Sequence, residues 1–224
     1  MARRNNQADG LPIAVLGLGR FGSSLAIELA RDGREVLGID ADERLVQDHA
    51  EELTRAVVAD TTDADALRQL GVPDLETAVV AIGDNLEASI LTTSLLVDFG
   101  IANIWAKATS REQGRILQRI GAHHVVLPEH DMGERVAHLV TGRMLDYIEF
   151  EDDYALAKTI APAEAVGRSL GESQLRSKYR VTVVGIKRSG EGFTYATADT
   201  VVRRGDVLIL AGRTAEVERV ANLS

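Results

Sequence analysis

Three glycines, Gly17, Gly19 and Gly22, have the G-x-G-x-x-G spacing of turns that hold nucleotide phosphates. Gly17 allows a tight turn, Gly19 lets the backbone approach a pyrophosphate, and Gly22 brings the next helix close to the preceding strand. The free N–H groups at the start of that helix favour an anion. Arg20 adds a cation there, and Asp40, at the end of the next apolar run, can accept hydrogen bonds from ribose hydroxyls. The pattern therefore predicts a nucleotide site; a glycine-rich turn without a ligand is the alternative.

Further candidates follow later apolar runs, because ligands bind at the carboxyl ends of parallel strands. Asp60 and Thr62 either contact an adenine edge or cap the next helix. Lys107 is a second cation of the site or a solvated lysine. Glu129 can accept a cation held by the phosphates, which makes it the metal candidate, or it is a favourable charge at a helix N-terminus. The residues expected at the nucleotide are Gly17, Gly19, Arg20, Phe21, Gly22, Asp40, Ala41, Asp60, Thr61, Thr62, Ala81, Ile82, Gly83, Lys107 and Glu129.

The elements that position these side chains are short apolar runs alternating with helical patterns. Strands are expected at 13–16, 35–39, 56–59, 78–82, 104–106 and 124–127. Helices are expected between them, at 23–31, 43–52, 64–70, 86–99 and 111–120. This alternation predicts an α/β fold, a Rossmann-like doubly wound parallel sheet.

The pattern changes after residue 128. An apolar stripe predicts one helix over 131–148, and the acidic run 149–153 indicates a boundary, since like charges resist packing. Beyond it, strands are expected at 154–160, 181–186 and 207–210, and helices at 172–178 and 214–223. We therefore expect a disordered tail at 1–10, a nucleotide-binding domain at 11–130, a crossover helix and linker at 131–150, and a smaller α+β domain at 151–224.

Composition excludes several classes of protein. The net charge of −9 over 224 residues argues against general binding to nucleic acid or anionic lipid. No apolar run approaches the ~20 residues that a membrane span needs. The absence of cysteine excludes disulfides and thiolate metal sites and fits a cytoplasmic protein. His123 and His124 alternate along a strand, so they are poorly placed to bind one metal ion. No catalytic group stands out, which leaves a small NAD-dependent oxidoreductase only as an alternative.

Several motifs together resemble one family. They are GLGRFG at 17–22, AIGDN at 81–85, IWAK at 104–107, PEHDMG at 128–133, VGRSL at 166–170 and GDVLIL at 205–210. These segments are similar to RCK proteins that regulate potassium uptake, of the Ktr type and close to the TrkA type, over nearly the whole chain. The resemblance implies a homodimer that assembles into an octameric ring beneath a membrane potassium-translocating subunit of the KtrB or TrkH type, at the inner face of the membrane.

The resemblance also implies ligands. ATP and ADP would bind the Rossmann pocket and shift the shape of the ring, with Arg20 at the terminal phosphate and Asp40 at the ribose. Lys107 would lie near the phosphates, and Glu129 would help to hold a divalent or monovalent cation. A TrkA-like response to NAD or NADH is the alternative.

A third ligand, cyclic di-AMP, is bound by the C-terminal domain of some relatives. The basic pair Lys187-Arg188 suits it, but the loop at 195–198 lacks the proline of those relatives. Cyclic di-AMP therefore stays an open hypothesis at this stage.

Overall fold

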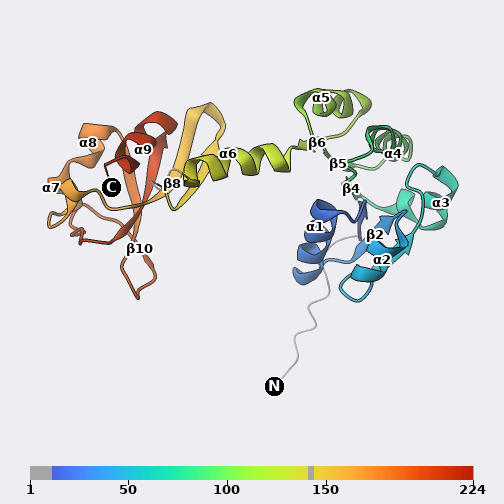
Figure 1. Ribbon diagram of the computed structural model, residues 1–224, viewed down its shortest axis with the longest axis horizontal. Helices are drawn as coiled ribbons and strands as arrows, with labels where there is room; N and C mark the ends of the chain where they lie inside the picture. The colour runs from blue at the N-terminus through green and yellow to red at the C-terminus, as the bar shows by residue number, and fades with distance from the viewer. Residues whose placement is uncertain (1–11, 141–143, 224) are drawn as a thin grey trace, which may run out of the picture. The chain divides into compact units, whose positions relative to one another are not determined.

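The computed structural model describes residues 12–140 and 144–223, which form two compact units dividing between His130 and Asp131 (Figure 1). The tail expected to be disordered, residues 1–10, lies outside the described residues. Each unit has its own sheet and core. None of the helices in the described segments has the length and apolar character that crossing a bilayer requires.

The first unit is built on a six-stranded parallel sheet. Its strands are β1 (Ile13–Leu16), β2 (Val36–Asp40), β3 (Arg55–Val58), β4 (Thr77–Val80), β5 (Asn103–Lys107) and β6 (His124–Val126). They lie in the order β3-β2-β1-β4-β5-β6. The order reverses between β1 and β4, and ligands bind at such a switch point. The predicted doubly wound parallel sheet is confirmed.

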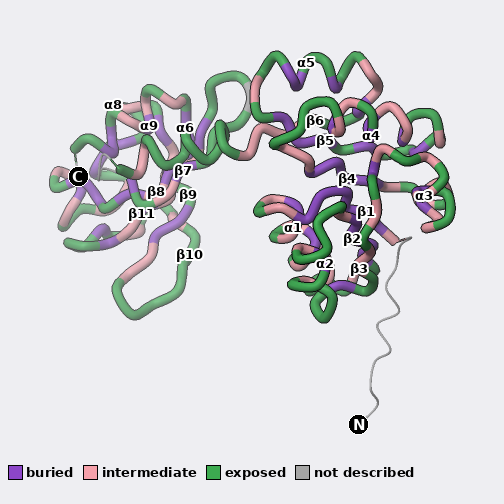
Figure 2. Tube along the Cα trace, turned by 45° about the vertical axis from the view of Figure 1, so that its right-hand side comes forward, coloured by how far each residue is buried: buried purple, intermediate pink, exposed green. Residues whose placement is uncertain are grey.

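Helices cover both faces of this sheet, because successive side chains of a strand point to opposite sides. One core contains Leu67, Leu96 and Leu117 from the helices after β3, β4 and β5, and the other contains Ala26 and Val46 from those after β1 and β2. The buried residues follow the central strands in Figure 2. The helices are α1 (Arg20–Arg31), α2 (Glu43–His49), α3 (Ala64–Gln69), α4 (Leu86–Asp98) and α5 (Arg111–Ile120), with a short 3-10 turn η1 (Val72–Asp74).

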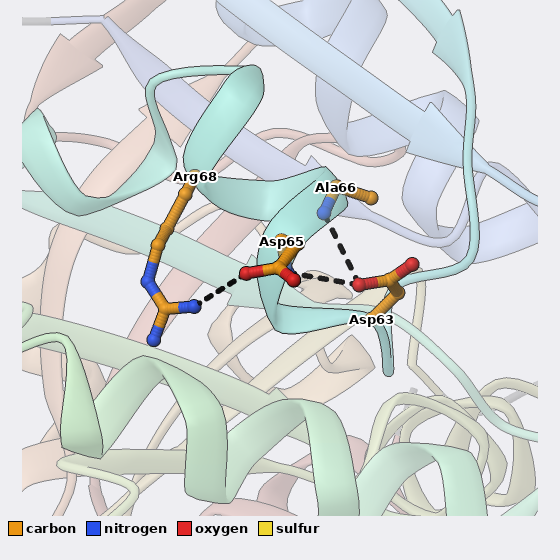
Figure 3. A network of polar contacts seen from close by, with 4 residues as sticks. All are labelled: Asp63, Asp65, Ala66 and Arg68. Atoms are coloured by element: carbon orange, nitrogen blue, oxygen red, sulfur yellow. Dashed lines mark hydrogen bonds and ion pairs between the residues drawn. The ribbon is translucent and has the colours of Figure 1, made fainter.

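The start of α3 is fixed by a side-chain cap (Figure 3). The Asp63 carboxylate accepts hydrogen bonds from the backbone N–H groups of Asp65 at 2.8 Å and Ala66 at 3.2 Å. Arg68 then pairs with Asp65 at 2.9 Å, one turn along the exposed side of the helix. Asp63 thus supplies the acceptor that an N-terminus needs. The capping interpretation is wrong for the two residues considered for it, Asp60 and Thr62.

The second unit is built on a five-stranded antiparallel sheet. Its strands are β7 (Asp146–Phe150), β8 (Tyr154–Ile160), β9 (Thr182–Lys187), β10 (Phe193–Tyr195) and β11 (Val207–Arg213), in the order β10-β9-β11-β8-β7. Helix α6 (Pro128–Val140) begins with the last three residues of the first unit, and the rest of it belongs to the second. The other helices of the second unit are α7 (Leu170–Ser173), α8 (Leu175–Tyr179) and α9 (Thr214–Ala221), with 3-10 turns η2 (Glu151–Asp153) and η3 (Ala163–Ala165). Leu208 and Leu210 of β11 pack in one core with Val217 and Val220 of α9. The expected smaller α+β domain is confirmed.

Two secondary-structure predictions are wrong. The helix expected over 131–148 ends earlier: residues 141–143 lie outside the described part, and Asp146–Phe150 forms β7, paired with β8. Within β7, Tyr147 is buried and Ile148 exposed, which is the alternation of a strand.

The acidic run is the end of β7 and a turn with positive φ at Asp152 and Asp153, so it joins two strands rather than two domains. The helix expected over 172–178 is two short helices, since Gln174 has a φ of 53°.

Candidate functional site

The glycine turn joins β1 to α1 in the geometry that the sequence predicts. Gly17 has a φ of +100°, which L side chains rarely adopt, and its N–H donates to the Ile39 carbonyl of β2 at 2.8 Å. A Cβ added at Gly22 would lie 1.9 Å from the Gly17 carbonyl oxygen. Only glycine therefore lets the helix start this close to the turn. The helix begins at Arg20, three residues before its expected start at 23.

Asp40 ends β2 and ties the glycine turn to the start of α2. One carboxylate oxygen accepts the Leu18 N–H at 2.6 Å, and the other accepts the Asp42 N–H at 2.8 Å. Each oxygen keeps a second lone pair that can accept another hydrogen bond. The carboxylate is therefore fixed by backbone donors and remains able to accept from ribose hydroxyls.

A cleft of about 460 Å³ opens at the carboxyl ends of the strands. That size lies within the ~300–1,000 Å³ range of small-molecule sites. Nine of the expected residues line it: Gly17, Gly19, Asp40, Ala41, Asp60, Thr61, Ala81, Ile82 and Gly83. Sequence reasoning missed four others, namely Leu45, Asp84, Asn85 and Ala88. Asn85 could have been found, because it is the residue type that caps a helix and it precedes α4.

The loop after β3 forms one wall of this cleft. Asp60 accepts hydrogen bonds from the backbone N–H of Thr62 at 2.8 Å and from its hydroxyl at 2.7 Å, and the hydroxyl bond is the main cause that lowers the pKa of Asp60. Thr61 is buried, and its hydroxyl accepts a hydrogen bond from Thr92 of α4 at 2.9 Å. These hydrogen bonds tie the loop to α4 and keep Asp60 at the cleft. Thr62 does not line the cleft.

Four expected residues, Arg20, Phe21, Lys107 and Glu129, lie next to the cleft, around the ends of β5 and β6. The Lys107 ammonium lies 2.7 Å from a Glu129 carboxylate oxygen and 5.8 Å from the centre of the Phe21 ring. The hydrogen bond from Lys107 is the main cause that lowers the pKa of Glu129, and the charge of Arg20 lowers it further. A Cβ added at Gly83 would lie 3.0 Å from the same ammonium, so Gly83 separates this cluster from the cleft. Lys107 is buried, so the interpretation as a solvated lysine is wrong.

An apolar groove of about 360 Å³ lies on the α1 side of the sheet, lined by Ile13, Phe21, Leu25, Leu29, Thr77, Val79, Trp105 and Val126. Trp105 stacks on His124, with ring centres 4.1 Å apart, while His123 accepts a hydrogen bond from the Ile104 N–H at 3.0 Å. Within the segments that the structure describes, no three His, Cys, Asp or Glu side chains gather as a metal site.

The basic pair of the second unit has partners inside that unit. Arg188 donates to the Val201 carbonyl at 3.2 Å and lies 3.9 Å from the buried Asp206 carboxylate. Lys187 lies over the Phe193 ring, 5.6 Å from its centre. Arg188 therefore links the end of β9 to the segment before β11, and this role is structural.

The strand order, the glycine turn and the acid at the end of β2 define a Rossmann-type domain, which is joined here to a small antiparallel α+β domain. The chain belongs to the TrkA family, because residues 13–128 match the TrkA-N domain and residues 158–224 match the TrkA-C domain.

Individual relatives agree with this assignment. The chain is 38% identical over 207 residues to Ktr system potassium uptake protein C of Bacillus subtilis (strain 168), covering 92% of this chain and 94% of the relative. It is 37% identical over 210 residues to Ktr system potassium uptake protein A of the same organism, covering 93% and 95%. The structure of the GsuK channel bound to NAD has the same fold, with a TM-score of 0.64 at 18% identity, over 97% of this chain and 40% of that one. The resemblance that the motifs indicate is confirmed.

Proposed function

We propose that this protein is a cytoplasmic, non-enzymatic regulatory subunit of a potassium uptake system. It binds ATP and ADP in the cleft of the first unit and controls a membrane potassium-translocating partner, whose inner face it meets. The names of its Ktr relatives support the potassium system, and the fixed Asp40 carboxylate beside the glycine turn supports a nucleotide ligand.

The residues that line the cleft favour an adenosine phosphate over a dinucleotide as the ligand. Its lining comes from the ends of β1 to β4 and the start of α4, which suits one adenosine phosphate. A dinucleotide would extend further along the same edge of the sheet, past the end of β4 to the ends of β5 and β6. There the Lys107–Glu129 pair bridges the ends of β5 and β6. Two cations, Arg20 and Lys107, thus lie where further phosphates follow the ribose, and cations bind such phosphates well.

Glu129 can hold a hard cation only if the phosphates of a bound nucleotide supply further oxygen ligands. The carboxylate is 59% exposed and uses one oxygen for Lys107, so it can offer an oxygen ligand. Among the described residues, Glu129 belongs to no group of three or more His, Cys, Asp or Glu side chains that could hold a metal ion. Mg²⁺ is often held by one or two carboxylates plus phosphate oxygens. The cation would therefore lie between Glu129 and the phosphates.

Titration of the purified chain with ATP, ADP, NAD and NADH tests the ligand. Arg20→Ala should weaken ATP far more than ADP, by about 10- to 100-fold, because one charge-assisted contact contributes about 1.5–3 kcal/mol. Arg31→Ala, at the other end of α1 and paired with Glu28, is the matched control. Tighter binding of NAD or NADH than of ATP would establish the alternative ligand. Equal losses for ATP and ADP would refute the role of Arg20.

The apolar surfaces of the chain support a homodimer. The Trp105 groove is lined by α1 and the sheet, its lining is almost wholly apolar, and Trp105 itself is exposed. Helix α6 carries a complementary stripe, Met132, Val136 and Val140, and none of its described residues is buried. Monomers rarely expose such surfaces without a partner. We place α6 of a second copy in the groove.

Sedimentation of the full chain tests this assembly. We expect the octameric ring for the wild-type protein, and dissociation when either surface carries a charge, through Val136→Glu on α6 or Leu25→Glu in the groove. A glutamate buried in an apolar contact costs several kcal/mol, which abolishes assembly at micromolar concentration. Unchanged mass for both variants would exclude this interface.

Cyclic di-AMP is proposed for the second unit from the resemblance alone. Arg188 is engaged with Val201 and Asp206, and the loop at 195–198 has no proline. Calorimetry of the full chain with cyclic di-AMP decides the matter: an absence of heat at micromolar ligand removes this ligand.

A further inference from the structure

We propose that the open face of the second sheet binds an anion with an apolar chain, of the chemical class of fatty-acid carboxylates. The chain lies in a hollow formed by β7, β8 and β11 with Phe193, and the carboxylate lies between Lys158 and Lys187. The site is built from the second unit alone. It therefore does not depend on the proposed nucleotide cleft.

The two faces of the second sheet differ in their exposure. On one face, Ala155 and Ala157 of β8 are buried in a core with residues of α8 and α9. Successive side chains of a strand point to opposite faces, so Tyr154 and Ile160 belong to the other face, where both are exposed. Ile148 of the neighbouring strand β7 is 50% exposed on this face as well. Contiguous exposed apolar surface of this kind marks interaction or ligand sites.

A hollow of about 280 Å³ lies on this open face. Its apolar walls are Ile148, Leu156, Ile209 and Phe193, and Lys158 lines it as well. The strand register places Leu156 opposite Ile148 and places Lys158 opposite Ile209. The volume lies just below the ~300–1,000 Å³ range of small-molecule sites. The hollow therefore suits a narrow apolar chain with its charged end at Lys158.

Two lysines mark where the anionic group lies. The ammonium of Lys158 is 5.8 Å and that of Lys187 is 5.6 Å from the centre of the Phe193 ring. In the described part of the chain, neither ammonium forms an ion pair or a hydrogen bond. The Asp146 carboxylate, which is opposite Lys158 in the register, pairs with Arg135 at 2.6 Å instead. An anion between the two ammonium groups removes their mutual repulsion through charge-assisted contacts.

The charges also decide which occupant fits the face. A second copy that paired symmetrically about Phe193 would bring four ammonium groups together, which like-charge repulsion opposes. A neutral apolar ligand would fill the hollow and leave both ammonium groups unpaired. An anion with an apolar chain meets both requirements, because its chain removes the walls of the hollow from water and its head neutralises the lysines. The face therefore favours a carboxylate on a single chain.

Calorimetry of the full chain with decanoate, below its micellar concentration, tests the inference. The wild type should bind decanoate saturably. Decanol, which lacks the charge, and acetate, which lacks the chain, should each bind about tenfold more weakly, because each loses one part of the contact. Lys158→Met and Lys187→Met should each weaken decanoate about two- to fivefold, since a partly exposed ion pair contributes about 0.5–1 kcal/mol, and should leave decanol unchanged.

Methyl NMR locates the ligand on the chain. The signals of Ile148 and Ile209 should move when decanoate is added. The signal of Ile13, which lines the apolar groove of the first unit, should stay in place.

Two controls separate this site from a general effect of charge. Lys178→Met is the matched variant, because Lys178 also lies over an aromatic ring, that of Tyr179, but pairs with Glu164. It should bind decanoate as the wild type does. An excess of cyclic di-AMP should also leave decanoate binding unchanged, although Lys187 belongs to the basic pair considered for that ligand.

Several results would overturn the inference. They are the absence of saturable decanoate binding, equal binding of decanol and decanoate, and an equal loss of affinity in Lys178→Met and Lys158→Met. Methyl shifts at Ile13 in place of Ile209 would put decanoate in the groove of the first unit. Competition between decanoate and cyclic di-AMP would assign Lys187 to that nucleotide instead.

Discussion

Gly22→Ala is the substitution for which the structure gives the largest expected effect at the phosphate turn. The added Cβ would lie 1.9 Å from the Gly17 carbonyl oxygen and 2.9 Å from the Ala81 Cβ. The first contact is with backbone, so α1 must move away from the turn. Overpacking of this kind costs about 1–3 kcal/mol or more. Alanine gains about 1 kcal/mol of helix propensity over glycine. We expect a net loss of about 2 kcal/mol.

The assay follows the first unit alone, because Trp105 is the single tryptophan of the chain. Thermal unfolding monitored by its fluorescence should shift down by about 8 °C, taking about 4 °C per kcal/mol for a unit of this size. ATP affinity should fall as well, since the turn is displaced. The control is Gly114→Ala in α5, where the nearest atom is a Val125 side-chain carbon at 3.2 Å that can give way. Equal midpoints for the two variants would refute the close-approach argument.

Two further predictions concern charge and space. The hydrogen bond from Arg135 is the main cause that lowers the pKa of Asp146. The pair therefore stabilises the folded state at pH values above the ordinary pKa of 3.8. This stabilisation is lost as the pH falls through the lowered pKa. Arg135→Gln should raise the Asp146 pKa toward 3.8 in a carbon-detected NMR titration; an unmoved titration contradicts the assignment. Gly83→Ala should push Lys107 off its position and weaken the binding of ATP severalfold more than that of AMP, as measured by calorimetry; equal loss of both nucleotides would place the damage in the cleft itself.

The first unit could be predicted because its information is local. Its strands are short apolar runs between helix-forming segments, and a parallel sheet buried on both faces produces that pattern directly. The glycine turn was predictable for the same reason: Gly17, Gly22 and Asp40 each meet a requirement of the backbone beside them.

The errors arose where local patterns are ambiguous. The stripe that predicts a helix up to 148 includes Met144, which packs in the core of the second unit, and ends at Leu145, directly before the residues that pair with β8. Apolar residues spaced for one helix face also fit a helix followed by a strand, and tertiary pairing decides between them. Likewise, the acidic run indicates a boundary by charge alone, whereas positive φ at Asp152 and Asp153 makes it a tight connection between strands.

The pairing of Lys107 with Glu129 was beyond local reasoning, because 22 residues separate them and only the register of β5 with β6 brings them together. This pairing distinguishes the two cations of the site. Arg20 is exposed at the first position of α1 and, in the described part of the chain, makes no hydrogen bond or ion pair. It can bind a phosphate at little cost, whereas Lys107 must first leave a carboxylate. For the proposed ATP ligand, we therefore expect recognition of the terminal phosphate to depend more on Arg20 than on Lys107.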